Sequence, residues 1–142
     1  LTESDADFRS QLDRLKEKCD YVFDRLQAMG LEPDRPAGGL FLWVPVAGLG
    51  LDGRTFAERL FREVRVLVGP GVAFGPSGSG HIRIGFAADD GRLREGLTRM
   101  AAFIDRVRDP SLGVKSLVPV EVAATEEPME VVADAKPTFS RV

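Results

Sequence analysis

The sequence predicts one α/β (α+β) domain in which helices cover a small mixed or antiparallel sheet of about three strands. Two long segments carry apolar residues at helical spacing, and short apolar or alternating segments, separated by glycine and proline, lie between them. The predicted order is helix, strand, helix, strand, strand, helix. A chain of 142 residues has the length of one domain, and 44% hydrophobic with 29% charged residues is typical of a soluble globular protein.

The first predicted helix covers residues 5–29. Its apolar side chains recur at alternating steps of four and three residues, which places them on one stripe. They are Phe8, Leu12, Leu15, Cys19, Val22, Leu26 and Met29. Ser4 is the candidate N-cap and Gly30 the candidate C-terminal stop. Such a helix measures about 37 Å, whereas a compact domain of about 110 residues has a radius of gyration of about 13 Å. We therefore expect its N-terminal end to project and to need another partner.

The middle of the chain alternates short apolar segments with turns. Residues 40–44 are apolar without interruption, which predicts a strand covered on both faces that Pro45 ends or places at an edge. A second helix is predicted over residues 52–63, with Asp52 as its N-cap. The β-branched residues at 64–68 predict a second strand, which the following glycine and proline would end.

Residues 81–87 predict a third strand, because apolar and polar side chains alternate in it. Ile82, Ile84 and Phe86 share one face, and Arg83 lies on the other. The spacing of apolar side chains predicts that such a strand has one buried and one open face.

The third helix is predicted over residues 89–108, capped by one of the two aspartates at its start. It completes a folded unit that we place at residues 1–112. Residues 113–142 form a C-terminal tail with three prolines and one aromatic residue. We expect this tail to be partly mobile or docked on another surface, with a candidate edge strand at 118–122.

Composition excludes several classes of function. A net charge of −3 is unlike the basic balance of nucleic-acid-binding domains, and no apolar run reaches the roughly 18 residues that cross a membrane. One cysteine, Cys19, and one histidine, His81, leave no Cys/His metal site. Cys19 lies on the apolar stripe and is interpreted as a small core residue. Because the chain starts at Leu1 without a leader pattern, we expect a piece of a longer or processed polypeptide, and we place it in the cytoplasm.

The glycine-rich segment 69–80 first suggests a phosphate-binding loop. A P-loop requires Gly-Lys-Ser/Thr ahead of a helix, and a dinucleotide fingerprint requires Gly-x-Gly-x-x-Gly between a strand and a helix. The segment has neither pattern. We therefore interpret it as a connection between strands in which glycines adopt positive φ.

Arg83 is the strongest candidate for binding chemistry. Its guanidinium is a planar fork that stays charged and can hold a carboxylate by two hydrogen bonds. A salt-bridged or solvated arginine on an open sheet face remains the alternative. His81, on the same face, has no acid or nucleophile partner fixed by the sequence and is interpreted as a loop-edge residue, and Trp43 is interpreted as a packing residue.

Three motifs follow one another at the predicted strand, loop and strand. They are Pro-Ala-Gly-Gly-Leu-Phe-Leu-Trp-Val at 36–44, Val-Gly-Pro-Gly-Val-Ala-Phe-Gly at 68–75 and Gly-His-Ile-Arg-Ile-Gly-Phe-Ala at 80–87. Together with the preceding helix, they resemble the C-terminal small domain of class I/II pyridoxal-phosphate-dependent aminotransferases of fold type I. The resemblance covers residues 5–108.

The resemblance implies transfer of an amino group between an amino acid and a 2-oxo acid, with pyridoxal phosphate as the cofactor of the parent enzyme. It implies that Arg83 binds the substrate α-carboxylate and that Gly39 and Phe41 line the substrate pocket. The family's reactive lysine, the acidic partner of its cofactor and its phosphate-binding loop belong to a large domain that nothing in this sequence matches. We therefore expect a fragment that neither binds the cofactor nor catalyses alone, and that works with the missing large domain of the same polypeptide in a homodimer.

Two other functions remain open from the sequence. A non-catalytic α/β interaction module would use the projecting helix to bind a partner. A pyridoxal-phosphate lyase or synthase of the same fold would share the three motifs.

Overall fold

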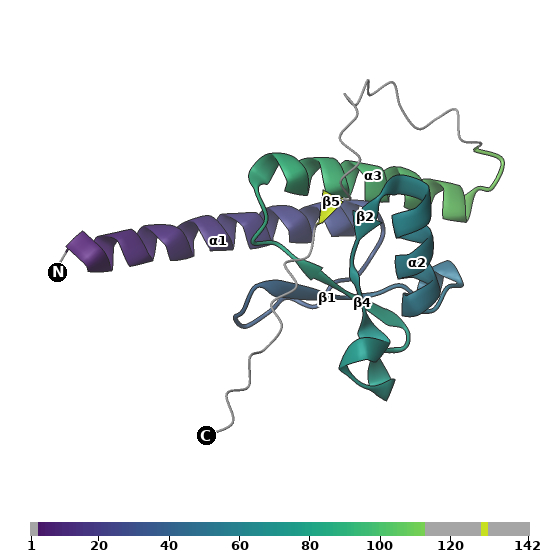
Figure 1. Ribbon diagram of the computed structural model, residues 1–142, viewed down its shortest axis with the longest axis horizontal. Coiled ribbons are helices and arrows are strands. Elements are labelled where there is room, and N and C mark those ends of the chain that lie inside the picture. Colours follow the sequence, from purple (N-terminus) through teal and green to yellow (C-terminus); the bar gives the residue numbers. More distant parts are fainter. Residues whose placement is uncertain (1–2, 113–128, 131–142) are drawn as a thin grey trace.

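The computed structural model describes residues 3–112 and 129–130 (Figure 1). The helices are α1 Glu3–Ala28, α2 Gly53–Val64 and α3 Asp90–Arg108. The strands are β1 Phe41–Pro45, β2 Val66–Leu67, β3 Gly69–Pro70, β4 His81–Gly85 and β5 Met129–Glu130. Short 3-10 helices lie at η1 Ala47–Leu49, η2 Gly71–Phe74 and η3 Pro76–Gly78.

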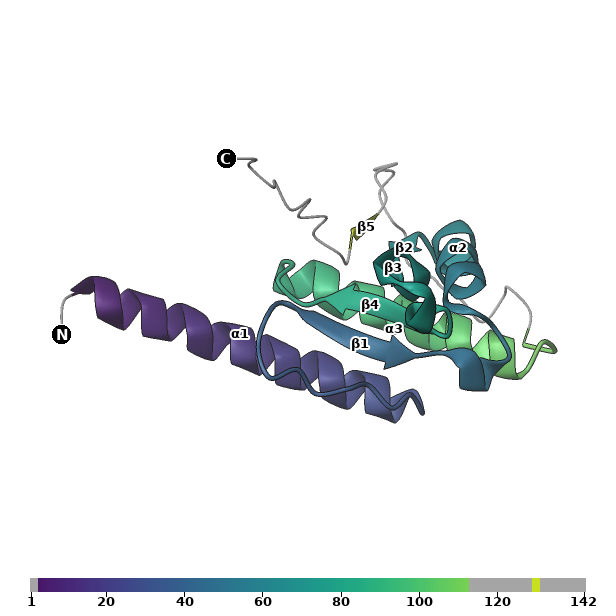
Figure 2. The same cartoon turned by 90° about the horizontal axis from the view of Figure 1, so that it is seen from below.

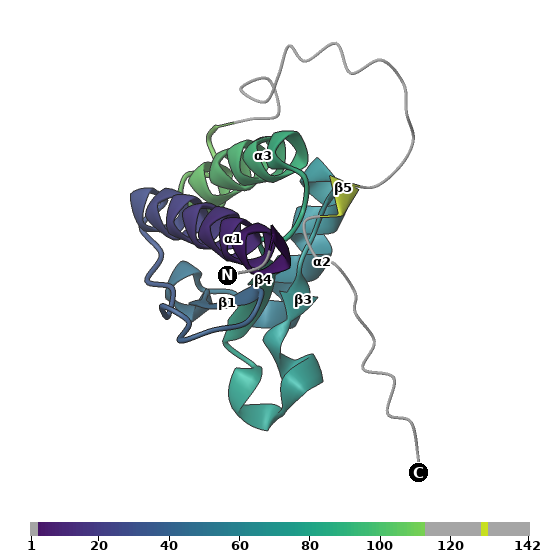
Figure 3. The same ribbon diagram turned by 90° about the vertical axis from the view of Figure 1, so that its left-hand side faces the viewer.

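The strands β1, β4 and β3 form an antiparallel sheet in that spatial order. Figures 2 and 3 show α1 and α3 side by side over one face of this sheet, α2 on the β3 side, and the η2–η3 loop projecting away from the two helices. The predicted α/β class, with helices over a small antiparallel sheet, is confirmed. Within residues 3–112, no helix is long and apolar enough to cross a membrane.

The core lies between the sheet and the three helices. On β4, Ile82 and Ile84 point into it and are fully buried, as Leu42 is on β1. The rings of Phe56 and Phe103 meet edge to face with 5.3 Å between centroids, which joins α2 to α3. The alternation predicted for residues 81–87 is thereby confirmed.

Helix α1 begins two residues earlier than expected and ends one residue earlier. Because it starts at Glu3, Ser4 lies inside the helix and is not its cap; acidic residues around it favour a first helical turn. At the other end Gly30 has a φ of 76°, and the Leu31 N–H donates to the carbonyl of Leu26 at 3.1 Å. This glycine-centred C-terminal turn is the predicted stop.

The N-terminal half of α1 projects beyond the rest of the domain (Figures 1 and 2). Val22 and Leu26 are fully buried, whereas Leu12 is 48% exposed and Phe8 62% exposed. The apolar stripe is continuous along the helix, but the described residues cover only its second half. The projection predicted from the length of the helix is therefore present.

Aspartates cap the other two helices, as predicted. The Asp52 carboxylate accepts a hydrogen bond from the Thr55 N–H at 2.8 Å, and this bond lowers the pKa of Asp52. The Asp89 carboxylate accepts from the N–H groups of Gly91 and Arg92 at 3.0 and 3.2 Å.

The strand expected at residues 64–68 is shorter than predicted. Val64 still belongs to α2, Arg65 takes the left-handed conformation at φ 59°, and only Val66–Leu67 is a strand. β2 ends before the glycine and proline, as predicted, but these two residues are not a simple break, because Gly69–Pro70 pairs with β4 as β3. Proline has no N–H to donate, but β3 is an edge strand, where proline is tolerated.

Among the described residues, helices cover one face of strand β1 only, whereas its uninterrupted apolar sequence predicts cover on both. Leu42 and Val44 are buried, and Phe41, Trp43 and Pro45 are half-buried on the other face. The difference has a simple cause, since α1 and α3 both pack on the same side of the sheet (Figure 3).

Two residues of the C-terminal tail are described. Met129–Glu130 pairs in parallel with Val66–Leu67 as a separate two-stranded sheet. The candidate edge strand at 118–122 lies outside the described residues, and the domain boundary at residue 112 remains a prediction.

Gly53 should tolerate no side chain. A Cβ there would lie 1.9 Å from the carbonyl oxygen of His81, a backbone atom that cannot move without disturbing β4. We expect Gly53→Ala to lower the free energy of unfolding by about 1–3 kcal/mol, measured by urea denaturation. Gly48→Ala is the control, because a Cβ at Gly48 has no atom within 4 Å. Equal stability of the two variants would show that α2 does not pack this closely on β4.

The projecting half of α1 should exchange its amide hydrogens quickly in this chain. Amides near Phe8 and Leu12 lack tertiary cover, so local opening there needs little free energy, whereas those near Val22 and Leu26 open only with the core. Hydrogen exchange followed by mass spectrometry measures the contrast. Uniform strong protection along the helix would mean that the projecting stripe already has a partner.

Candidate functional site

The sheet face opposite α1 and α3 carries Arg83 among aromatic side chains. The central carbon of its guanidinium is 4.0 Å from the ring centroid of Phe41 and 3.8 Å from that of Phe74. β1 supplies Phe41, β4 supplies Arg83 and η2 supplies Phe74, so three elements meet at one positive charge. An arginine enclosed in this way keeps its N–H donors in a defined place, which suits recognition of a carboxylate.

Trp43 and His81 extend this aromatic group along the sheet. Their rings stack with 5.2 Å between centroids and 15° between planes, and Trp43 meets Phe74 edge-on at 6.2 Å. Trp43 therefore packs, as expected. His81 is half-buried against it, and its Nδ1 has no hydrogen-bond partner in the described part of the chain. No acid or nucleophile among the described residues therefore bonds this nitrogen.

The glycine-rich segment is a compact connection that carries Phe74 to Arg83. A Cβ on Gly71 would lie 2.3 Å from the carbonyl oxygen of Gly78, so the two backbones touch. Within the loop the Gly78 N–H donates to the carbonyl of Gly75 at 3.0 Å, and Gly75 has a φ of 138°. A loop whose N–H groups bond inward is poorly built to hold a phosphate, which supports its interpretation as a connection.

Gly39 and Phe41, expected together at a substrate pocket, lie in different surroundings. Phe41 contacts Arg83. Gly39 has a φ of 84° and borders a cleft between α1 and the loop before β1, lined also by Leu15 and Phe86. Phe86 is buried on the helix side of the sheet, so this cleft opens on the α1 side. The structure therefore brings Phe41 to the arginine and Gly39 to the α1 cleft.

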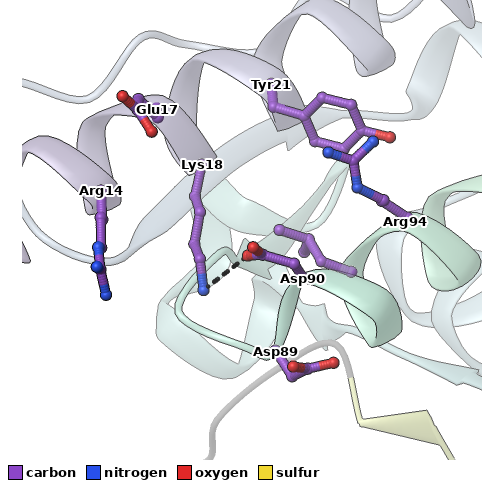
Figure 4. A pocket seen from close by; sticks show the side chains of 8 residues that line it. Arg14, Glu17, Lys18, Tyr21, Asp89, Asp90 and Arg94 are labelled. Atoms are coloured by element: carbon purple, nitrogen blue, oxygen red, sulfur yellow. Dashed lines mark ion pairs between the residues drawn. The ribbon is translucent and has the colours of Figure 1, made fainter.

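The groove between α1 and the start of α3 is lined by side chains of both charges (Figure 4). In it Lys18 Nζ lies 3.1 Å from the Asp90 carboxylate and donates to the carbonyl of Ala88 at 2.8 Å. These two bonds tie α1 to the N-terminus of α3. Lys16, the other lysine of the described residues, borders the same cleft as Gly39.

Cys19 is half-buried on the apolar stripe, which supports its interpretation as a packing residue. Burial, and to a lesser degree the Asp20 carboxylate, raises the pKa of the Cys19 thiol, while the Arg35 guanidinium opposes this. The protonated thiol is a weak nucleophile.

Phe74 is the residue of this face that sequence reasoning did not single out. It lies in a loop, where no periodicity assigns a direction to a side chain. A signal was present in Gly69, which pairs with Arg83 across the sheet. A Cβ at Gly69 would lie 3.4 Å from the Phe74 ring, so the glycine leaves room for a ring beside the arginine.

Comparisons with known proteins match this arrangement to a family. The model of the family "aminotransferase class I and II" matches residues 2–100. A probable N-acetyl-LL-diaminopimelate aminotransferase of Bacillus subtilis is 33% identical over 97 residues, which are 68% of this chain and 25% of that protein. An arginine–pyruvate transaminase of Pseudomonas aeruginosa is 46% identical over 72 residues, which are 51% of this chain and 18% of that protein.

Solved structures have the same fold. An aromatic aminotransferase from Pyrococcus horikoshii superposes with a TM-score of 0.70 at 29% identity, over 75% of this chain and 29% of that one. An aspartate aminotransferase from Thermotoga maritima gives 0.62 at 34% identity, over 68% of this chain and 24% of that one. This chain thus spans about a quarter of the length of these relatives. Because the family model matches well over half of its residues, the chain belongs to the class I and II aminotransferase family.

Proposed function

We propose that this chain is the small domain of a pyridoxal-phosphate-dependent aminotransferase and that Arg83 binds the α-carboxylate of both substrates, an amino acid and a 2-oxo acid. The observation that carries the proposal is the Arg83 guanidinium, enclosed by Phe41 and Phe74 on the open face of the sheet. The relatives compared above are aminotransferases or transaminases, which favours amino-group transfer over a lyase or synthase reaction.

The two substrates of a transamination share the α-carboxylate and differ at the α-carbon. A guanidinium binds a carboxylate through two parallel N–H···O bonds and stays charged at any pH at which an enzyme works. Two such bonds fix the orientation of the carboxylate as well as its position, so the α-carbon is presented in one geometry. Arg83 would contribute binding and orientation, with no proton exchanged.

The aromatic surroundings strengthen this interaction. Phe41 and Phe74 flank the guanidinium, and Trp43 packs against Phe74. These rings displace water from the sides of the charge, and attraction between opposite charges grows as the local dielectric constant falls. A carboxylate bound here would gain more than at an arginine on a flexible, solvated side chain.

Pyridoxal phosphate, when bound, supplies the electron sink that this chemistry needs. The described residues do not fit a site for it. Their lysines, Lys16 and Lys18, both lie on α1, across the sheet from Arg83, and Lys18 is paired with Asp90. We therefore assign the cofactor and its lysine to a large domain outside this chain, and the greater length of the relatives supports this assignment.

A large domain would cover the two surfaces that the described residues leave open. One is the aromatic face of the sheet, where Phe74 is 50% exposed; the other is the projecting stripe of α1, with Phe8 and Leu12. Exposed apolar groups of this size indicate a contact with another folded unit. The homodimer and a role in amino-acid metabolism follow from the family alone.

Removal of the guanidinium in the enzyme that contains this domain should weaken substrate binding and turnover while the cofactor stays bound. We expect Arg83→Ala to lower kcat/KM by the equivalent of about 2–5 kcal/mol, the usual loss when one member of a hydrogen-bonded charge pair is removed. Steady-state kinetics and the absorbance of the bound cofactor measure the two effects. Arg62→Ala, at an exposed position on α2, is the control. An unchanged kcat/KM in Arg83→Ala would remove Arg83 from the site.

The 142-residue chain by itself should form no specific site for pyridoxal phosphate. Titration of the cofactor should give only the weak, non-saturating absorbance change of exposed amines, and the Lys16→Arg and Lys18→Arg variants should behave like the unchanged chain. A saturable absorbance band that disappears on replacement of one lysine would contradict the assignment of the cofactor to another domain.

A further inference from the structure

Phe74 has an unusual position for an aromatic side chain of a small domain. It is 50% exposed, so burial in the core does not explain where it lies. Its ring instead covers the Arg83 guanidinium at 3.8 Å, from the β3 side, while the Phe41 ring covers it at 4.0 Å from the β1 side. The arginine on the central strand is thus enclosed by one ring from β1 and one from η2, the turn that follows β3.

Several contacts other than the one with the Arg83 guanidinium hold Phe74 in this place. Gly69 has no side chain, and the Phe74 ring lies 3.4 Å from where its Cβ would be. The loop is closed behind Phe74 by the contact of Gly71 with Gly78, where a Cβ on Gly78 would lie 2.2 Å from the Gly71 carbonyl oxygen. Trp43 meets the ring edge-on at 6.2 Å. The glycine-rich loop therefore aims one aromatic ring at the arginine.

We propose that Phe74 is a positioning residue that, together with Phe41, fixes the Arg83 guanidinium for binding a substrate carboxylate. The inference rests on the proposed role of Arg83. It also gives the glycine-rich loop a role, which is to place the Phe74 ring against the arginine. Arginine has a long side chain whose rotamer freedom must be lost when it grips a ligand. Two rings that enclose the guanidinium remove that freedom during folding, so carboxylate binding no longer carries this cost. Cation–π attraction holds the arrangement in place.

The test uses the enzyme that contains this domain. It distinguishes the effect of the aromatic ring of Phe74 from the effect of its size. Phe74→Leu keeps an apolar side chain and removes the ring, whereas Phe74→Tyr keeps the ring. We expect Phe74→Leu to raise KM for both the amino acid and the 2-oxo acid by about 3- to 30-fold, the equivalent of one cation–π contact, with a smaller change in kcat. Phe74→Tyr should stay within about twofold of the unchanged enzyme.

The matched control is Phe61→Leu on α2. Phe61 also lies under a guanidinium, that of Arg65 at 5.6 Å, but on a helix outside the open face. Its replacement removes an arginine–phenylalanine contact of the same kind and should leave both KM values unchanged. A shift equal to that of Phe74→Leu would mean that the effect reports general destabilisation, and it would overturn the positioning role.

A double-mutant cycle distinguishes action through Arg83 from direct contact with the substrate. In an Arg83→Lys background, Phe74→Leu should change KM by less than about twofold, because the group that it positions is gone. If Phe74→Leu keeps its full effect there, Phe74 touches the substrate itself and the inference is wrong. An unchanged kcat/KM in Arg83→Lys would contradict the proposed role of Arg83, and with it the inference about Phe74. If Arg83→Lys lowers kcat/KM but Phe74→Leu leaves KM unchanged, only the inference about Phe74 is wrong.

A second readout needs only the 142-residue chain. The Nε–H resonance of Arg83, assigned by its loss in Arg83→Lys, should be displaced by the two ring currents. Pentafluorophenylalanine at position 74 keeps the shape of the ring, so the chain should fold, but it reverses the ring's electrostatics and should release the guanidinium. We expect this substitution to move the resonance toward that of a solvated arginine, and Phe61→Leu to leave it in place. An Nε–H signal already at the solvated position in the unchanged chain would overturn the proposal.

Discussion

The structure depends on one constraint, the direction of the side chains along β4. Ile82 and Ile84 are buried under α1 and α3, so Arg83 between them must leave on the other side of the sheet. A shift of one residue would place its charge in the core, where an uncompensated charge costs several kcal/mol. The register of the central strand is therefore fixed by the charge as much as by the isoleucines. Both helices pack on the apolar side, and the arginine side remains open.

Once β4 is fixed, the pairing of the sheet assembles the site. Trp43 lies opposite Arg83 on one side and Gly69 on the other, and Phe41 lies opposite Gly85. Small and large residues thus alternate around the guanidinium, and the Phe74 ring lies beside Gly69. The same antiparallel hydrogen bonds that hold the sheet together determine which groups surround the charge. The stability of the fold and the geometry of the site therefore depend on the same contacts. Replacement of a glycine in the sheet, such as Gly69, would alter both.

Local patterns in the sequence were enough to predict the features that depend on local physics. The stripe of α1, its stop at Gly30, the caps Asp52 and Asp89 and the alternation of β4 all follow from spacing and from single residue types. The pairing of Gly69–Pro70 with β4 could not be predicted in this way, since both residues locally favour a break and only an edge position beside a formed strand makes them acceptable. The direction of Phe74 was hidden for the same reason. It is set by backbone contacts within the loop, and those contacts join residues that no periodicity connects.

The apolar stripe of α1 shows how far such patterns reach. From Phe8 to Met29 the spacing does not change, yet one half is buried and the other is exposed in this chain. The spacing of apolar residues predicts that one face of the helix is covered, but it does not identify the element that covers it. The aromatic face of the sheet has the same character, because the uninterrupted apolar sequence of β1 predicts two covered faces and residues 3–112 provide cover for one. The N-terminal half of the α1 stripe and the aromatic face of the sheet are thus both exposed in the described part of the chain. Each would be stabilised by contact with apolar side chains of another folded unit. The single large domain that we propose would account for both and would bring its own reactive groups to the face where Arg83 lies.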